Sequence, residues 1–70
     1  MKVTLLIKKY RKKAGLTQSA CAEKSSLSLR FFQDVESGTR TPSLRTLYNI
    51  AKVLEIHISD LIRDDIFPKE

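Results

Sequence analysis

The chain has 70 residues, of which 13 are lysine or arginine and 8 are aspartate or glutamate, and its formal net charge is +5. This length is near the lower limit for one packed domain and leaves no room for a second. Cys21 is the only cysteine, which excludes a disulfide framework or a multi-cysteine zinc site within the chain. The apolar run at residues 5–7 is too short for a membrane span or a signal-peptide core, so we expect a cytoplasmic protein without a membrane partner.

The positive charge is concentrated in the first third of the chain. Residues 1–24 carry seven basic side chains and one acidic side chain, whereas residues 25–70 carry six basic and seven acidic ones. Such asymmetry favours a polyanionic partner, and the alternative is a basic surface that serves only solubility.

Two helices are predicted in the basic part. The first has one apolar stripe with helical spacing, made by Val3, Ile7, Tyr10 and Ala14. Gly15 follows as its stop, because glycine accepts the left-handed conformation that ends many helices. Thr17 can cap a second, short helix over residues 18–24, with Cys21 and Ala22 on its inner side.

A third helix is predicted over residues 29–36. Ser28 is a good cap for its start, and Gly38 ends it. Phe32 and Val35 are spaced to face inward together. The chain then turns before the next helical pattern.

The fourth helix has the strongest periodicity in the chain. It follows Pro42, begins after the cap residue Ser43, and has on one side Leu44, Leu47, Ile50, Ala51 and Leu54. Ser59 can cap a last short helix over residues 60–65.

We therefore predict an all-α fold of five short helices in one domain over residues 1–66, followed by a short C-terminal tail over residues 67–70. Only about three residues separate the second and third helices. Such a tight turn is typical of a helix-turn-helix, in which one helix crosses the DNA backbone and the next lies in the major groove.

Several short segments share the spacing of a known family. They are Gly15–Gln18, Ala22–Lys24, Val35–Gly38, Pro42–Leu44, Ile50–Lys52 and Ile58–Ile62. In these segments the chain resembles the Cro/cI-like helix-turn-helix domain, also called the XRE family, over about residues 3–62. The resemblance implies a compact five-helix domain of the lambda-repressor-like DNA-binding type. Members include small phage repressors, restriction-modification controller proteins and antitoxins.

The resemblance places the base-reading positions at the cap and on the outer face of the third helix. These positions are Ser28, Leu29, Arg30, Gln33 and Asp34. Their chemistry suits the role, since arginine can donate twice to guanine, glutamine can pair with adenine, and leucine can touch a thymine methyl group. Asp34 either accepts from cytosine or orients an arginine, and we favour the second role.

A second set of residues is expected to contact the DNA backbone. The resemblance places Gln18 against a phosphate, and the other members are Thr17, Phe31, Ser37, Thr39, Arg40 and Ser43. Phe31 and Phe32 point about 100° apart on a helix, so one apolar stripe cannot hold both rings. We expect Phe32 to be buried and Phe31 to face DNA, and the alternative is that Phe31 packs against the second helix or the Lys24 stem.

The resemblance also implies a structural ion pair between Arg11 and Glu36, which joins the first and third helices. The sequence departs from the family at three positions. Ser26 stands where the turn usually has glycine and would need a positive φ, Cys21 replaces a leucine as a small buried hydrophobe, and Ser25 replaces an apolar residue.

We expect a sequence-specific transcriptional regulator, phage-encoded or bacterial, that binds a palindromic operator in double-stranded DNA as a homodimer. Its dimer interface is predicted at Ile56, Ile58, Leu61, Ile66 and Phe67, together with exposed parts of the fourth helix. The alternative is an antitoxin or a protein-interaction adaptor, which acidic residues near the C-terminus could support. We expect no enzyme activity, cofactor, metal or small-molecule ligand, since His57 has no second ligand at metal spacing.

Overall fold

The computed structural model describes residues 6–61, which contain four α-helices and one short 3₁₀ helix. These are α1 (Ile7–Lys13), α2 (Gln18–Lys24), α3 (Leu29–Ser37), α4 (Leu44–Val53) and η1 (Ile58–Leu61). The predicted all-α fold is confirmed, because residues 6–61 contain no strand. The predicted helix over residues 60–65 is represented by η1, and its later part lies outside the described residues.

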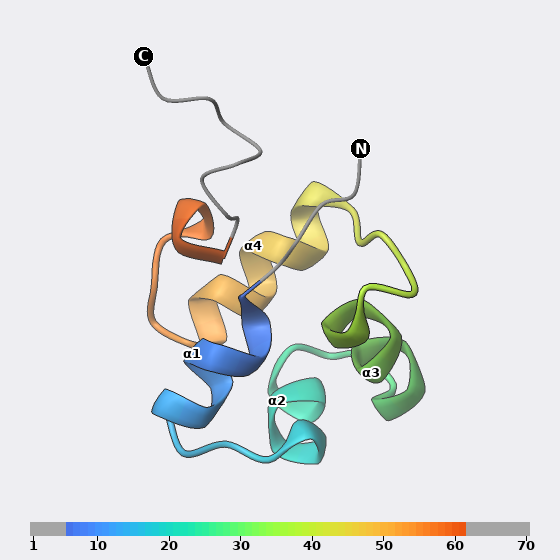
Figure 1. Ribbon diagram of the computed structural model, residues 1–70, viewed down its shortest axis with the longest axis horizontal. Coiled ribbons are helices and arrows are strands. Elements are labelled where there is room, and N and C mark those ends of the chain that lie inside the picture. The colour runs from blue at the N-terminus through green and yellow to red at the C-terminus, as the bar shows by residue number, and fades with distance from the viewer. Residues whose placement is uncertain (1–5, 62–70) are drawn as a thin grey trace.

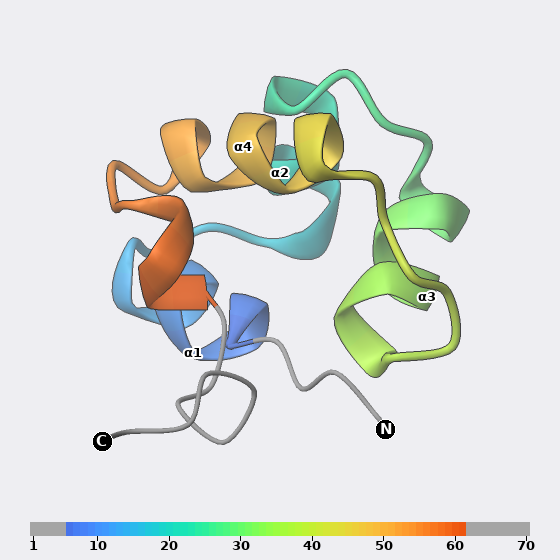
Figure 2. The same ribbon diagram turned by 90° about the horizontal axis from the view of Figure 1, so that it is seen from above.

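The helices form one packed unit around a shared core. α4 spans the molecule from the loop after α3 to η1, as both views show (Figures 1 and 2). α2 packs against α3 and α4, and α4 packs against η1. The Leu6 amide donates to the Leu61 carbonyl at 2.8 Å, which ties η1 to the start of α1. None of the helices in this part of the chain has the length and apolarity that crossing a bilayer requires.

Three helices begin at the hydroxyl caps that the sequence predicts. The side-chain oxygens of Thr17, Ser28 and Ser43 accept from the backbone amides three residues later, at 3.0–3.1 Å. Each bond satisfies one of the amides that a helix start leaves without a partner, which typically contributes about 1 kcal/mol.

The tight turn between α2 and α3 depends on Ser26, which has a φ of +59°. The predicted positive φ is thus confirmed, at a cost on the order of 1 kcal/mol relative to glycine. Gly38 ends α3 in the same left-handed region with a φ of +86°. Glu55, just after α4, also has a positive φ of +58°, which the sequence does not predict.

The core draws on all five helices and on Leu54 directly after α4. Its members are Ile7, Cys21, Ala22, Phe32, Val35, Leu47, Ile50, Ala51, Leu54 and Leu61. Ser25 is also buried, and its hydroxyl has no hydrogen-bond partner within the described residues, which costs free energy because the group has lost its hydration. Burial raises the pKa of the Cys21 thiol, in keeping with a small buried hydrophobe.

Three predictions about apolar residues are wrong. Ala14 is exposed because α1 ends at Lys13, before the apolar stripe reaches it. Leu44 is 73% exposed because it lies at the edge of the core-facing stripe of α4. Leu61 is fully buried, since η1 folds back onto the start of α1, and it is therefore unavailable for a dimer interface.

A buried ion pair joins α1 to α3. Arg11 Nε donates to Glu36 Oε2 at 2.7 Å, and both side chains are less than one-tenth exposed. Arg11 Nη1 also donates to the Leu16 carbonyl at 2.8 Å, in the segment between α1 and α2. One side chain therefore fixes three parts of the chain relative to one another.

Replacing Arg11 by methionine should lower the free energy of unfolding by about 3–5 kcal/mol, because Glu36 would keep its charge in a buried site without its partner. The matched control is Arg30→Met, which removes the same group from an exposed pair and should cost less than about 1 kcal/mol. Urea denaturation measures both values. Similar losses in the two variants would contradict a buried structural role for Arg11.

Candidate nucleic-acid interface

α3 has an apolar side and a polar side. Phe32 and Val35 are fully buried, whereas the Arg30 side chain is 85% exposed and Leu29 is 41% exposed. Gln33 is exposed on the same helix, and Ser28 is exposed at its cap. The residues predicted to read bases thus lie together at one surface, except that Asp34 is half-buried beside them.

Asp34 connects α3 to the loop that follows. Its carboxylate lies 3.5 Å from Arg30 Nε, one helical turn earlier. Its carbonyl oxygen accepts from the amides of Thr39 at 2.8 Å and Arg40 at 3.1 Å, and from the Ser37 hydroxyl at 3.2 Å. An exposed pair of this kind stabilises the fold little.

Phe31 is half-buried and packs at the edge of the core. Its ring lies under the Arg40 guanidinium, 5.7 Å from the ring centroid, which is within the range of a cation–π interaction. The ring therefore restrains a loop arginine beside the outer face of α3. The contact of this ring with DNA stays a prediction, as does the alternative that it packs against α2 or the Lys24 stem.

The amide of Gln18 is held within the protein. Its Nε2 donates to Glu36 Oε1 at 2.6 Å, and its Oε1 accepts from Gln33 Nε2 at 3.1 Å. These bonds extend the buried ion pair to the outer face of α3. We call Arg11, Glu36, Gln18 and Gln33 the polar relay.

The remaining predicted backbone contacts are partly committed to internal bonds. Ser37 and Thr39 share a hydrogen bond at 2.9 Å, and the Ser43 hydroxyl donates to Thr46 Oγ1 at 3.0 Å. Thr17 and Ser28 are exposed and use their oxygens as helix caps, so their hydroxyl protons remain free to donate to an anion.

An apolar strip lies on the outer side of α4. Leu44 is 73% exposed and Tyr48 is 57% exposed, and each lines a surface hollow that also includes Ile58. Ile56 lines the hollow on the other side of Tyr48. We call Leu44, Tyr48, Ile56 and Ile58 the α4 apolar face. Sequence reasoning missed Tyr48, although its i, i+4 spacing from Leu44 puts both on one side of a helix.

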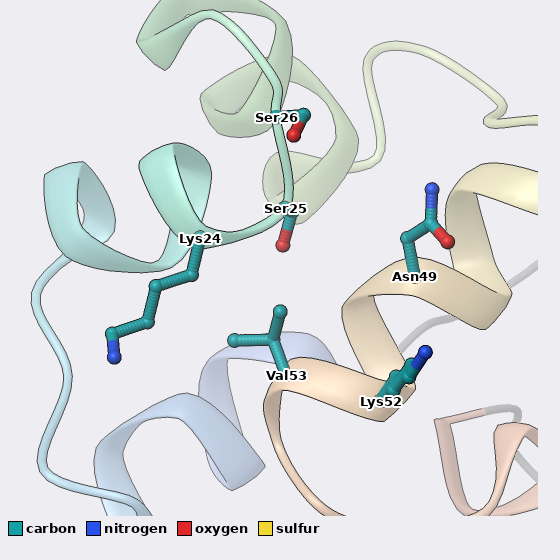
Figure 3. A pocket seen from close by; sticks show the side chains of 6 residues that line it. All are labelled: Lys24, Ser25, Ser26, Asn49, Lys52 and Val53. Carbon is teal, nitrogen blue, oxygen red and sulfur yellow. The ribbon is translucent and has the colours of Figure 1, made fainter.

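A polar hollow separates the end of α2 from α4 (Figure 3). It is lined by Lys24, Ser25, Ser26, Asn49, Lys52 and Val53. Both lysines lie in the last turns of their helices, where a cation stabilises the negative end of the helix dipole. This placement explains the two charges without a ligand. No group of three potential metal ligands occurs within residues 6–61.

Residues 7–61 match the sequence pattern of the helix-turn-helix family. The chain is 39% identical, over all its 70 residues, to the immunity repressor protein of Bacillus phage phi105, and spans about half (49%) of that protein's length. The chain therefore belongs to the XRE-type helix-turn-helix family of DNA-binding transcription regulators, which are not enzymes.

Two solved structures agree with this assignment. The restriction-modification controller protein C.AhdI from Aeromonas hydrophila matches with a TM-score of 0.75 at 30% identity, over 77% of this chain and 82% of its own. SinR, the master regulator for biofilm formation, in complex with DNA, matches with a TM-score of 0.72 at 30% identity, over 76% of this chain and 86% of its own. The predicted resemblance and the type of domain are confirmed.

Proposed function

We propose that this chain is a sequence-specific regulator that binds a palindromic operator as a homodimer, with α3 of each subunit in the major groove. The observation that carries the proposal is that Arg30 and Gln33 are exposed on the outer side of α3, whereas the opposite side of this helix is fully buried. The similarity to SinR, whose structure was solved in complex with DNA, supports DNA binding by this chain.

The proposed base contacts follow from the donors and acceptors on this face. Arg30, oriented by Asp34, donates to O6 and N7 of a guanine, and Gln33 pairs with an adenine. Leu29 packs on a thymine methyl group, and Ser28 donates its free hydroxyl proton at the start of the helix.

The proposed backbone contacts surround this face. From the end of α3 and the loop after it, phosphate is contacted by Ser37, Thr39 and Arg40. The Phe31 ring holds the Arg40 guanidinium through the cation–π contact. Thr17 and Gln18 approach from the start of α2, each with a proton that its internal bonds leave free, and Ser43 approaches from the start of α4.

The proposed dimer interface is the α4 apolar face. A single module of this size buries little DNA surface, and a two-fold dimer would read two half-sites about 34 Å apart. Exposed apolar side chains that cluster on one surface are typical of an interaction site, and Ile56 and Ile58 from the original prediction lie within it. Ile66 and Phe67 lie outside the described residues and stay predictions.

The second candidate function is an antitoxin or adaptor, in which a different protein covers the α4 apolar face. The exposure of Leu44 and Tyr48 is the observation that favours it. Self-association in the absence of other proteins distinguishes the dimer from this alternative.

Selection from random duplexes should return a palindromic sequence with two half-sites one helical turn apart. Affinity for that sequence should fall with added salt by about 0.9 log units per log salt for each phosphate contact. Fluorescence anisotropy measures both the affinity and the salt slope. Weak binding that is equal on all duplexes at physiological salt would refute the proposed regulator.

Arg30 and Arg40 are expected to act in different ways. Arg30→Ala should reduce discrimination at one or two base pairs by about 1–3 kcal/mol, whereas Arg40→Ala should weaken binding to all sequences alike. Anisotropy titrations on the selected operator and on a series of single base-pair changes separate these effects. Equal losses on every duplex for Arg30→Ala would move this residue to the backbone contacts.

A charge on the α4 apolar face should disrupt the dimer. Tyr48→Lys should raise the dimer dissociation constant by about 30-fold, because it places an ammonium group where the proposed dimer would bury an aromatic ring. Asn49→Lys is the matched control, since it adds the same charge at the next, exposed position outside this face. Sedimentation equilibrium measures both constants, and equal dissociation of the two variants would exclude this interface.

A further inference from the structure

We infer that the buried charge pair of Arg11 and Glu36 dictates, through Gln18, which way the Gln33 amide faces, and that it thereby makes Gln33 selective for adenine over guanine. This inference rests on the proposed function, because it concerns how that site discriminates between bases. Gln18 is then a positioning residue for Gln33 as well as a backbone contact.

The direction of the polar relay follows from what each group can donate or accept. Arginine only donates hydrogen bonds, and an ionised carboxylate only accepts them. Glu36 therefore accepts from Arg11 on one side and requires a donor from Gln18 on the other. Gln18 must turn its NH₂ group toward Glu36, at 2.6 Å, which leaves its carbonyl oxygen toward α3.

The same count of donors and acceptors determines the orientation of the Gln33 amide. Since Gln18 presents an acceptor, Gln33 must turn its NH₂ group toward it, and the bond is 3.1 Å long. A flipped Gln33 amide would place two carbonyl oxygens against each other. The orientation of this exposed amide is thus set by a charge pair that is itself buried.

This orientation matches adenine. One N–H of Gln33 is committed to Gln18, so one N–H and the carbonyl oxygen remain for a base. Adenine offers an acceptor at N7 and a donor at N6, which pair with that N–H and that oxygen. Guanine offers two acceptors at O6 and N7, and the Gln33 carbonyl oxygen would then face an acceptor.

Preorganisation adds to this selectivity. A free glutamine side chain loses rotamer freedom when it binds a base, and a side chain already held in one orientation loses less. The hydrogen bond from Gln33 to Gln18 supplies this restraint before DNA arrives.

Gln18→Met tests the inference, because methionine keeps the unbranched length and removes both hydrogen-bonding groups. Gln33→Met identifies the base pair that Gln33 reads. Ser19→Ala is the matched control at the next, exposed position of α2. Each variant is titrated against the selected operator and its single base-pair changes, and urea denaturation confirms that each variant is folded.

The expected result for Gln18→Met is a loss of about tenfold in adenine-over-guanine preference at the Gln33 position, in addition to a uniform loss from its phosphate contact. The double variant should lose no more preference there than Gln33→Met alone, because Gln18 acts on this base through Gln33. Ser19→Ala should keep the preference. In the free protein, the Gln33 side-chain amide resonances should shift on Gln18→Met and stay in place on Ser19→Ala.

Three results would overturn the inference while the proposed function stands. They are a purely uniform loss on all duplexes for Gln18→Met, unchanged discrimination for Gln33→Met, and unmoved Gln33 amide resonances in Gln18→Met. If the wild-type chain selects no sequence at all, the proposed function itself fails, and the inference fails with it.

Discussion

The ion pair between Arg11 and Glu36 is the interaction on which the arrangement of this small domain depends. Two opposite charges, each less than one-tenth exposed, can remain buried only while they stay together. Separating α1 from α3 would leave both charges in a poorly solvated place. The additional bond from Arg11 to the Leu16 carbonyl brings the segment before α2 under the same constraint.

The ion pair also affects side chains at the surface of α3, because Glu36 lies on this helix, which is proposed to read DNA. On its inner side that helix is held by Phe32 and Val35, which are fully buried. On its other side Glu36 holds Gln18, and Gln18 holds Gln33. A buried electrostatic pair and an exposed amide are therefore parts of one set of hydrogen bonds.

The two sides of α4 differ in exposure. Leu47, Ile50 and Ala51 fill the core, whereas Leu44 and Tyr48 remain at the surface. A domain of 70 residues buries only about 60% of the surface of its unfolded chain, so apolar side chains that it leaves exposed in one cluster are available to a partner. The same helix-turn-helix fold occurs in a controller protein and in a regulator of biofilm formation, so the fold alone does not decide the biological role.

The sequence by itself determined the local features of this protein. Hydroxyl caps at Thr17, Ser28 and Ser43, the stop at Gly38 and the strained turn at Ser26 depend only on neighbouring residues, so their positions were predicted correctly. Helical spacing alone also predicted that Phe32 and Val35 lie on the buried side of α3.

Only the tertiary structure decided which surfaces meet. Leu61 is buried because η1 folds back onto the start of α1, and Leu44 is exposed because the core ends before it reaches that edge of α4. Gln18 bonds to Glu36 and Gln33, and Arg40 lies over Phe31, through contacts between residues 9 to 18 positions apart. Periodicity defines the faces of one helix, but the partner of each face is set by how all the helices share one small core, which no local pattern encodes.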